Sequence, residues 1–305
     1  MDAIIQRAQR LQGILTVPPD KAICHRVVLL AAVADGDTEL TSWPSADDCQ
    51  RTLQLVEGLG VRVQRFAGRV TVTGRPSGLL APSAVLDCGE SGTTLRVSAG
   101  LLAGQPFTAR LSAGPSLSGR PMRRIIEPLS QMGARMDGTA GPAGSSERYP
   151  PLTIHGTRPL RAIRYVLPVA SAQVKSAMLL AGLFADGPTV VVEPNPTRDH
   201  TERALRRFGA QVEIRGREIS VSPGELTSPG RLALPGDVSS AAFLMVAACC
   251  VAGSRIELRD VGLNPTRTGL LTVLKRMGAA TSMTRDFAHR RSADFRSRYA
   301  AKSMN

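Results

Sequence analysis

The 305-residue sequence has few aromatic residues, few cysteines and no long apolar run. Aromatic residues make up 4% of the chain against 43% apolar residues overall, so aliphatic side chains must fill the core. The five cysteines are odd in number and form no CxxC motif, which argues against a disulfide framework and a zinc site and predicts a cytoplasmic location. The N-terminus lacks the apolar run of a signal peptide. The longest apolar run, Ala241–Ala252, is too short to span a membrane and predicts a buried helix.

Signatures of covalent, nucleotide and metal chemistry are absent as well: the sequence contains no nucleophile elbow, no P-loop and no HExxH motif. His25 and His200 lack a partner that would complete a triad, so we expect both to be structural. The net charge of +13 suits nucleic acid, a membrane surface or small anions. No Lys/Arg block with interleaved aromatics occurs before residue 281, which favours small anionic substrates. We expect no metal, cofactor, membrane or nucleic-acid partner, with a basic nucleic-acid-binding module as an alternative.

The chain consists of four sequence repeats. Each repeat begins with an apolar, small-residue segment that ends at a glycine, continues with a β-rich stretch, and closes with an amphipathic segment and a second glycine. These closing glycines, 69 to 76 residues apart, are Gly60, Gly133, Gly209 and Gly278. Each stands where a C-terminal glycine would end a helix. The pattern predicts βαβαββ units with one buried and one half-exposed helix each, and therefore a layered α/β fold.

Four segments that can hold anions recur at predicted helix starts, where backbone N–H groups and the helix dipole attract negative charge. They are Val17–Arg26, Asp87–Arg96, Ser116–Arg124, and Ser171–Ser176 followed by Thr197–Glu202. The candidate ligands in them are Lys21, Arg26, Gly92, Arg120, Ser171, Gln173 and Arg198. Read singly, each segment could equally be a capped helix with solvated cations. Lys175 lies in an otherwise apolar helix, so its charge needs a partner.

Together these segments resemble the 5-enolpyruvylshikimate-3-phosphate synthase family (3-phosphoshikimate 1-carboxyvinyltransferase). The resemblance runs over about residues 11–280, and its motifs are Asp20-Lys21…His25-Arg26, Gly89…Ser91-Gly-Thr-Thr…Arg96, Ser116-Leu…Arg120-Pro-Met, Ser171-Ala-Gln-Val-Lys-Ser, Arg198-Asp-His-Thr-Glu-Arg and Gly262-Leu-Asn-Pro-Thr-Arg-Thr-Gly. It implies transfer of the enolpyruvyl group of phosphoenolpyruvate to the 5-hydroxyl of shikimate 3-phosphate, with release of phosphate. Such a transferase serves the shikimate pathway to chorismate and the aromatic amino acids.

The resemblance also implies residue roles. Lys21 would contact both substrates and act in catalysis, while Gly92 and Arg120 would hold phosphoenolpyruvate. The shikimate 3-phosphate site would comprise Lys21, Ala22, Arg26, Ser171, Ala172, Gln173 and Arg198. Four residues replace ones usual in the family: Pro19, Ala22, Cys24 and Glu90. A carboxylate at Glu90 should repel phosphoenolpyruvate unless it is protonated or paired.

By the same resemblance, residues 18–236 form a complete three-unit domain, and residues 1–17 with 237–280 form part of a second. Residues 281–305 are basic and without apolar periodicity. We expect no closing strand there, but a disordered tail or a frameshift product. A second hypothesis is therefore a truncated, inactive remnant that binds shikimate 3-phosphate but lacks most of the acid–base residues.

Two further expectations concern relatives and assembly. The sister enzymes that act on a UDP-sugar carry a Lys-Asn signature where this chain has Lys21-Ala22, which disfavours that activity. A complete protein of this family would be monomeric. The partial second domain would expose apolar faces, including that of Ala241–Ala252, and so promote association.

Overall fold

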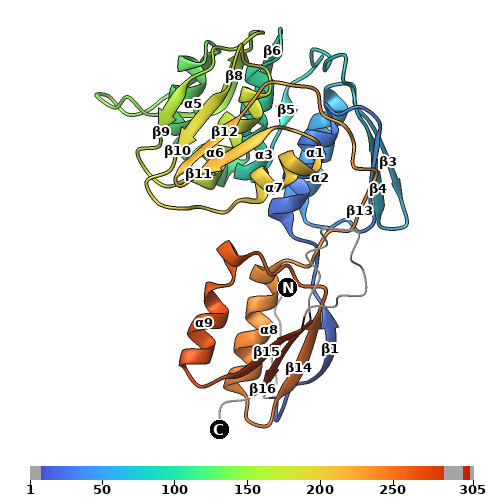
Figure 1. Cartoon of the computed structure of the whole chain (residues 1–305). Helices are drawn as coiled ribbons and strands as arrows, with labels where there is room; N and C mark the ends of the chain where they lie inside the picture. The colour runs from blue at the N-terminus through green and yellow to red at the C-terminus, as the bar shows by residue number, and fades with distance from the viewer. Residues whose placement is uncertain (1–7, 285–297, 303–305) are drawn as a thin grey trace. The chain divides into compact units, whose positions relative to one another are not determined.

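The computed structural model describes residues 8–284 and 298–302 and divides into two compact units (Figure 1). Unit 1 comprises Met1–Asp20, Ser42–Pro44 and Ala233–Asn305, and unit 2 comprises Lys21–Thr41 and Ser45–Leu232. The domain boundaries expected from the repeats, 18–236 with 1–17 and 237–280, stay a prediction. Within the described ranges, no helix is long and apolar enough to cross a membrane.

Unit 2 contains three repeats, each with one buried and one partly exposed helix. The buried helices are α1 (Lys21–Ala31), α3 (Gly92–Ala103) and α6 (Ala172–Gly182). The partly exposed helices are α2 (Asp47–Gly58), α5 (Arg123–Gln131) and α7 (His200–Arg207), and a short α4 (Pro115–Ser118) precedes α5. Helix α3 packs against both α1 and α6, so small and aliphatic side chains form the centre of the unit. The predicted layered α/β repeat architecture is confirmed.

Three four-stranded sheets surround these helices, and all share one topology. Their strand orders are β13-β2-β4-β3, β5-β6-β8-β7 and β9-β10-β12-β11. In each sheet two strands pair in parallel, and an antiparallel hairpin extends the sheet. The strands are β2 (Asp37–Leu40), β3 (Arg62–Phe66), β4 (Arg69–Thr73), β5 (Leu86–Asp87), β6 (Thr108–Ser112), β7 (Arg135–Ala140), β8 (Arg148–His155), β9 (Arg164–Val166), β10 (Thr189–Val192), β11 (Val212–Arg215), β12 (Glu218–Val221) and β13 (Arg231–Leu232).

The first and fourth repeats exchange their leading strands. Strand β1 (Gln12–Thr16) precedes α1 in sequence but pairs in parallel with β14 (Arg255–Arg259) of the fourth repeat. Conversely, β13 precedes the fourth repeat in sequence but pairs in parallel with β2 of the first. The chain therefore closes its first sheet with a strand from the end of unit 2.

Unit 1 holds the fourth repeat, in which α8 (Val238–Cys250) and α9 (Gly269–Arg276) pack on the sheet β1-β14-β16-β15. A 3₁₀ turn, η1 (Pro265–Arg267), precedes α9. The core of this unit comprises Ala241, Met245, Leu258, Val261 and Leu271, among others.

The expectation that no strand closes the fourth repeat is wrong. Strand β15 (Ala280–Thr284) and strand β16 (Arg298–Lys302) form an antiparallel pair, and β16 also pairs with β14. Both strands are ordered by backbone pairing within the sheet, and segments of five residues carry too little periodicity to reveal them in the sequence. The rest of the predicted tail, residues 285–297 and 303–305, lies outside the described residues.

Helix α8 is apolar on all sides, yet one side faces solvent. Phe243 is 80% exposed and Val246 41% exposed, whereas Ala241 and Met245 are fully buried. On α9, Val273 and Met277 near its end are exposed as well. Exposed apolar residues of this kind favour association, which stays a prediction.

The closing glycines end their helices as predicted. Gly60, Gly133, Gly209 and Gly278 adopt φ values of 81°, 105°, 85° and 91°. This left-handed conformation is costly for residues with a Cβ, so glycine at each repeat boundary lets the chain turn from helix into the next strand.

Candidate anion-binding site

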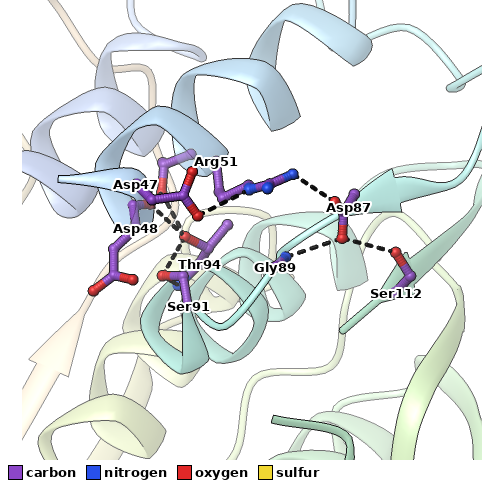
Figure 2. Close-up of polar contacts among 9 residues, drawn as sticks. Asp47, Asp48, Arg51, Asp87, Gly89, Ser91, Thr94 and Ser112 are labelled. Atoms are coloured by element: carbon purple, nitrogen blue, oxygen red, sulfur yellow. Dashed lines mark hydrogen bonds and ion pairs between the residues drawn. The ribbon is translucent and has the colours of Figure 1, made fainter. Parts of the chain in front are cut away.

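The loop between β5 and α3 is fixed by polar contacts with neighbouring helices and strands (Figure 2). The Asp87 carboxylate accepts hydrogen bonds from the Gly89 amide (2.9 Å) and the Ser112 hydroxyl (3.1 Å), and it forms an ion pair with Arg51 (2.5 Å). At the start of α3, Ser91 caps the helix by accepting from the Thr94 amide at 3.2 Å. These contacts hold the Gly89–Gly92 backbone in place without any ligand.

Glu90 is paired with backbone amides. Its carboxylate accepts hydrogen bonds from the amides of Ser116 (3.1 Å) and Leu117 (2.7 Å) at the start of α4. Amide donors stabilise a carboxylate, so the negative charge expected to repel phosphoenolpyruvate is in part paired. Glu90 therefore ties the loop before α3 to the loop that ends at Arg120.

Three arginines gather beside this loop. Burial, and then the nearby charges of Arg124 and Arg120, lower the pKa of Arg96 to about 10. Arg96 is only 4% exposed, and its Nε has no hydrogen-bond partner in the described structure. Across residues 8–284 and 298–302, no carboxylate lies within ion-pair distance of Arg96, Arg120 or Arg124. An uncompensated cluster of guanidinium groups is a site for a phosphate or carboxylate.

Gln173 joins this cluster to helix α6. Its side-chain oxygen accepts from Arg96 Nη1 at 3.0 Å, and its nitrogen donates to the Thr93 hydroxyl at 3.1 Å. A Cβ on Gly92 would lie 3.0 Å from Arg96 Nη1, so glycine leaves room for that guanidinium. The predicted residues Gly92, Arg120 and Gln173 thus lie close to one another. Arg96 belongs to the same sequence motif but is not among the predicted ligands, although its position after a glycine-rich helix start indicates such a role.

Arg26 lies in a second group, buried among α1, α6 and α7. Its guanidinium donates from Nε to the Thr201 hydroxyl (2.6 Å), from Nη2 to the Ser176 hydroxyl (2.9 Å) and from Nη1 to the Ala22 carbonyl (2.7 Å). Arg26 is 4% exposed. Protein groups therefore fix its orientation, and Ala22 contributes through its backbone. Ser176 and Thr201 stand inside the quoted motifs, but the sequence did not indicate their contact with Arg26.

The remaining predicted residues lie at the starts of α1, α6 and α7. Lys21 Nζ forms a partly exposed ion pair with Asp48 at 2.8 Å. Ser171 caps α6 by accepting from the Val174 amide at 3.4 Å, and Ala172 begins that helix. Arg198 is exposed just before α7, and within the described part of the chain no hydrogen bond or ion pair joins it to the arginine cluster. No group of three or more metal-ligating side chains occurs among the described residues.

His25 of α1 is buried, as expected of a structural histidine. Its Nδ1 lies 2.7 Å from the Thr52 hydroxyl. Burial, followed by the charge of Arg26, lowers the pKa of His25 to about 3. The imidazole is therefore neutral in the folded protein at neutral pH.

A pH dependence of stability follows from His25. The unfolded chain takes up a proton on this side chain below pH 6.5, whereas the folded protein does so only near pH 3. The stability that neutral His25 contributes is therefore complete above pH 6.5 and is lost as the pH falls. Between pH 7 and pH 5 we expect the free energy of unfolding to fall by about 2 kcal/mol because of His25, and a His25→Gln variant should not show this part of the loss.

Urea unfolding of both proteins at pH 7 and pH 5 measures this difference. A His155→Gln variant is the control, because His155 is 31% exposed and lies on β8. If the free energy of unfolding changed equally between pH 7 and pH 5 in the wild type and in His25→Gln, this would contradict the buried, neutral state of His25.

Repeated βαβαββ units, with cationic and hydroxyl side chains at the starts of their buried helices, define an enolpyruvyl-transferase-like class of protein. Comparisons with known proteins identify the group within that class. The family model for EPSP synthase (3-phosphoshikimate 1-carboxyvinyltransferase) matches residues 5–305. The chain belongs to the EPSP synthase family.

Relatives and solved structures agree with this assignment. The 3-phosphoshikimate 1-carboxyvinyltransferase of Geobacillus kaustophilus is 50% identical over 270 residues, which cover 88% of this chain and 62% of that protein. The Xylella fastidiosa enzyme is 45% identical over 98% of this chain and 65% of its own length. The structure of EPSP synthase from Acinetobacter baumannii matches 96% of this chain and 64% of that chain with a TM-score of 0.85 and 42% identity. The chain thus spans less than two thirds of the length of these relatives.

Proposed function

We propose that this chain binds phosphoenolpyruvate and shikimate 3-phosphate on unit 2 and acts in enolpyruvyl transfer between them. The observation that carries the proposal is the cluster Arg96, Arg120 and Arg124, which lacks carboxylate partners in the described structure. Each substrate carries a phosphate and a carboxylate, so both need several cations or N–H donors. A cytoplasmic location and a place in aromatic amino-acid biosynthesis accompany this proposal.

The two groups of residues suit two anionic ligands. Gly92, Arg120 and the neighbouring Arg96 would hold phosphoenolpyruvate, and Gln173 would lie between the two ligands. Arg26, Ser171 and Ala172 would face shikimate 3-phosphate, with Ala22 and Arg198 nearby at the helix starts. Bound anions would supply the counter-charge that Arg96 lacks and raise its lowered pKa toward the usual value.

The transfer itself needs three proton movements. The 5-hydroxyl gives up its proton as its oxygen bonds to C2 of phosphoenolpyruvate, and a proton is added to the methylene carbon. Loss of a proton from the resulting methyl group then expels phosphate and restores the double bond. Lys21, at the start of α1 and paired with Asp48, is the candidate that would act in these steps.

Phosphate release tests the proposal directly. Purified chain 1–305 is mixed with shikimate 3-phosphate and phosphoenolpyruvate, and we expect release that Lys21→Ala lowers at least about a hundredfold. An Arg203→Ala variant, which removes a surface ion pair with Asp199, is the control and should keep its rate. Release that Lys21→Ala leaves unchanged would contradict the proposed role.

Binding without transfer is the second candidate function, and one observation favours it. The arginine cluster has cations and N–H donors, and among the described residues no carboxylate forms an ion pair with it, while the nearby Glu90 is occupied by backbone amides. Calorimetric titration with shikimate 3-phosphate separates the two candidate functions. Binding without phosphate release would support a chain that only binds. Absence of both binding and release would exclude both functions.

A further inference from the structure

A buried charge cluster lies inside unit 2, away from the arginine cluster. Lys175 of α6 places its ammonium 3.0 Å from Glu193, which follows β10, and 2.6 Å from Glu202 of α7. The three side chains are 1%, 6% and 2% exposed. Charged groups at this depth are costly unless they are paired, so the cluster supplies the partner that Lys175 was expected to need.

The cluster has one cation and two carboxylates. Glu193 also accepts a hydrogen bond from the Thr197 hydroxyl, whereas one oxygen of Glu202 has no partner in the described structure. Burial raises the pKa of Glu202 against the opposing effect of Lys175, with a small further rise from Asp199. The ionic interaction between α6 and the first turn of α7 therefore depends on Lys175.

A second layer of contacts joins the same two helices next to this cluster. Ser176 follows Lys175, Thr201 precedes Glu202, and their hydroxyls lie 2.6 Å apart. Because Ser176 donates its proton to the Ala172 carbonyl, Thr201 must donate to Ser176. Both oxygens are then oriented as acceptors for Arg26, at 2.6 Å from Nε and 2.9 Å from Nη2.

We propose that Lys175 is a positioning residue that holds α7 against α6 and thereby orients the Arg26 guanidinium through Thr201 and Ser176. The charge cluster fixes the spacing of the two helices one residue away from the hydroxyl pair. Lys175 would thus control the affinity for a phosphorylated, carboxylate-bearing ligand that it does not touch. The identity of that ligand rests on the proposed function, but the orientation of Arg26 does not.

The test uses a variant that keeps the interior neutral. The triple change Lys175→Met, Glu193→Gln and Glu202→Gln removes all three charges together, which buried sites tolerate better than an unpaired carboxylate. Thr201→Val is the matched variant, because it removes the Arg26 acceptor directly and leaves the charge cluster intact. Urea unfolding confirms that both variants are folded.

The first readout needs no ligand. In the wild type, the Arg26 Nε–H signal in a ¹H–¹⁵N spectrum, assigned with Arg26→Lys, should exchange slowly with water because it is buried and hydrogen-bonded. We expect exchange to become about tenfold faster in the triple variant and in Thr201→Val, as for the loss of one hydrogen bond. If the Arg26 Nε–H exchanged as slowly in a folded triple variant as in the wild type, the proposal would be overturned.

The second readout is the affinity for shikimate 3-phosphate. We expect each variant to bind about tenfold more weakly, and the combined variant to bind about tenfold rather than about a hundredfold more weakly, because both act through Arg26. A combined variant that binds about a hundredfold more weakly would overturn the proposal that both changes act through Arg26. If the wild type does not bind this ligand, the proposed function fails while the exchange measurement still decides the role of Lys175.

Discussion

Replacing Gly100 by alanine is expected to lower the free energy of unfolding by about 3 kcal/mol. Gly100 lies in the C-terminal half of α3, which packs against α6. A Cβ built there would lie 1.9 Å from the Ala177 carbonyl oxygen and 2.6 Å from the Ala177 Cα. Backbone atoms cannot relieve the clash by changing rotamer as a side chain can. Helices α3 and α6, in the centre of unit 2, would therefore have to move apart.

Gly224→Ala provides the matched control. Gly224 has no atom within 4 Å of an added Cβ and does not adopt a positive φ, so alanine there should cost little. Urea unfolding of both variants, with unchanged m-values, measures the difference. Equal stability of the two variants would mean that α3 and α6 do not approach each other closely at Gly100.

The second large effect is expected for Lys175→Met, with a loss of about 3–5 kcal/mol in the free energy of unfolding at pH 7. Methionine fills a similar volume but leaves Glu193 and Glu202 buried without their cation. Burial already raises the pKa of Glu202, and removal of Lys175 should raise it further. A carboxyl with a raised folded-state pKa binds more protons when folded, so the deficit should shrink as the pH falls from 7 toward 5.

Two comparisons separate this effect from the loss of any ion pair. Lys21→Met removes a pair whose side chains are 46% and 35% exposed, and it should cost less than about 1 kcal/mol. The triple variant at positions 175, 193 and 202 should recover most of the stability. A Lys175→Met deficit that stays constant with pH would contradict the unpaired-carboxylate explanation.

The repeat pattern predicted much of the fold because it is a local signal. Residues such as Gly133 and the apolar face of α5, with Ile125 and Leu129 fully buried, follow from helical spacing alone. The exchange of β1 and β13 between repeats could not be predicted in this way, since pairing between distant segments leaves no trace in local periodicity. Strand β16 was missed for the same reason.

The candidate site was predicted by residue type more than by arrangement. The motifs named Gly92, Arg120 and Gln173, which the structure brings together around Arg96. They did not indicate that Arg26 is buried against Thr201, because the partner lies 175 residues away in the sequence.

The exchanged strands also set the order in which the nascent chain can complete its sheets. Strand β2 pairs with β13 at Glu39 and Arg231, so this edge of the first sheet waits for 192 further residues to be synthesised. At roughly 5–20 residues per second, the wait is about 10–40 s. During that time β2 presents unpaired backbone groups to other chains on the same polysome. The first repeat therefore emerges from the ribosome first but acquires its last strand only after the second and third repeats have been made.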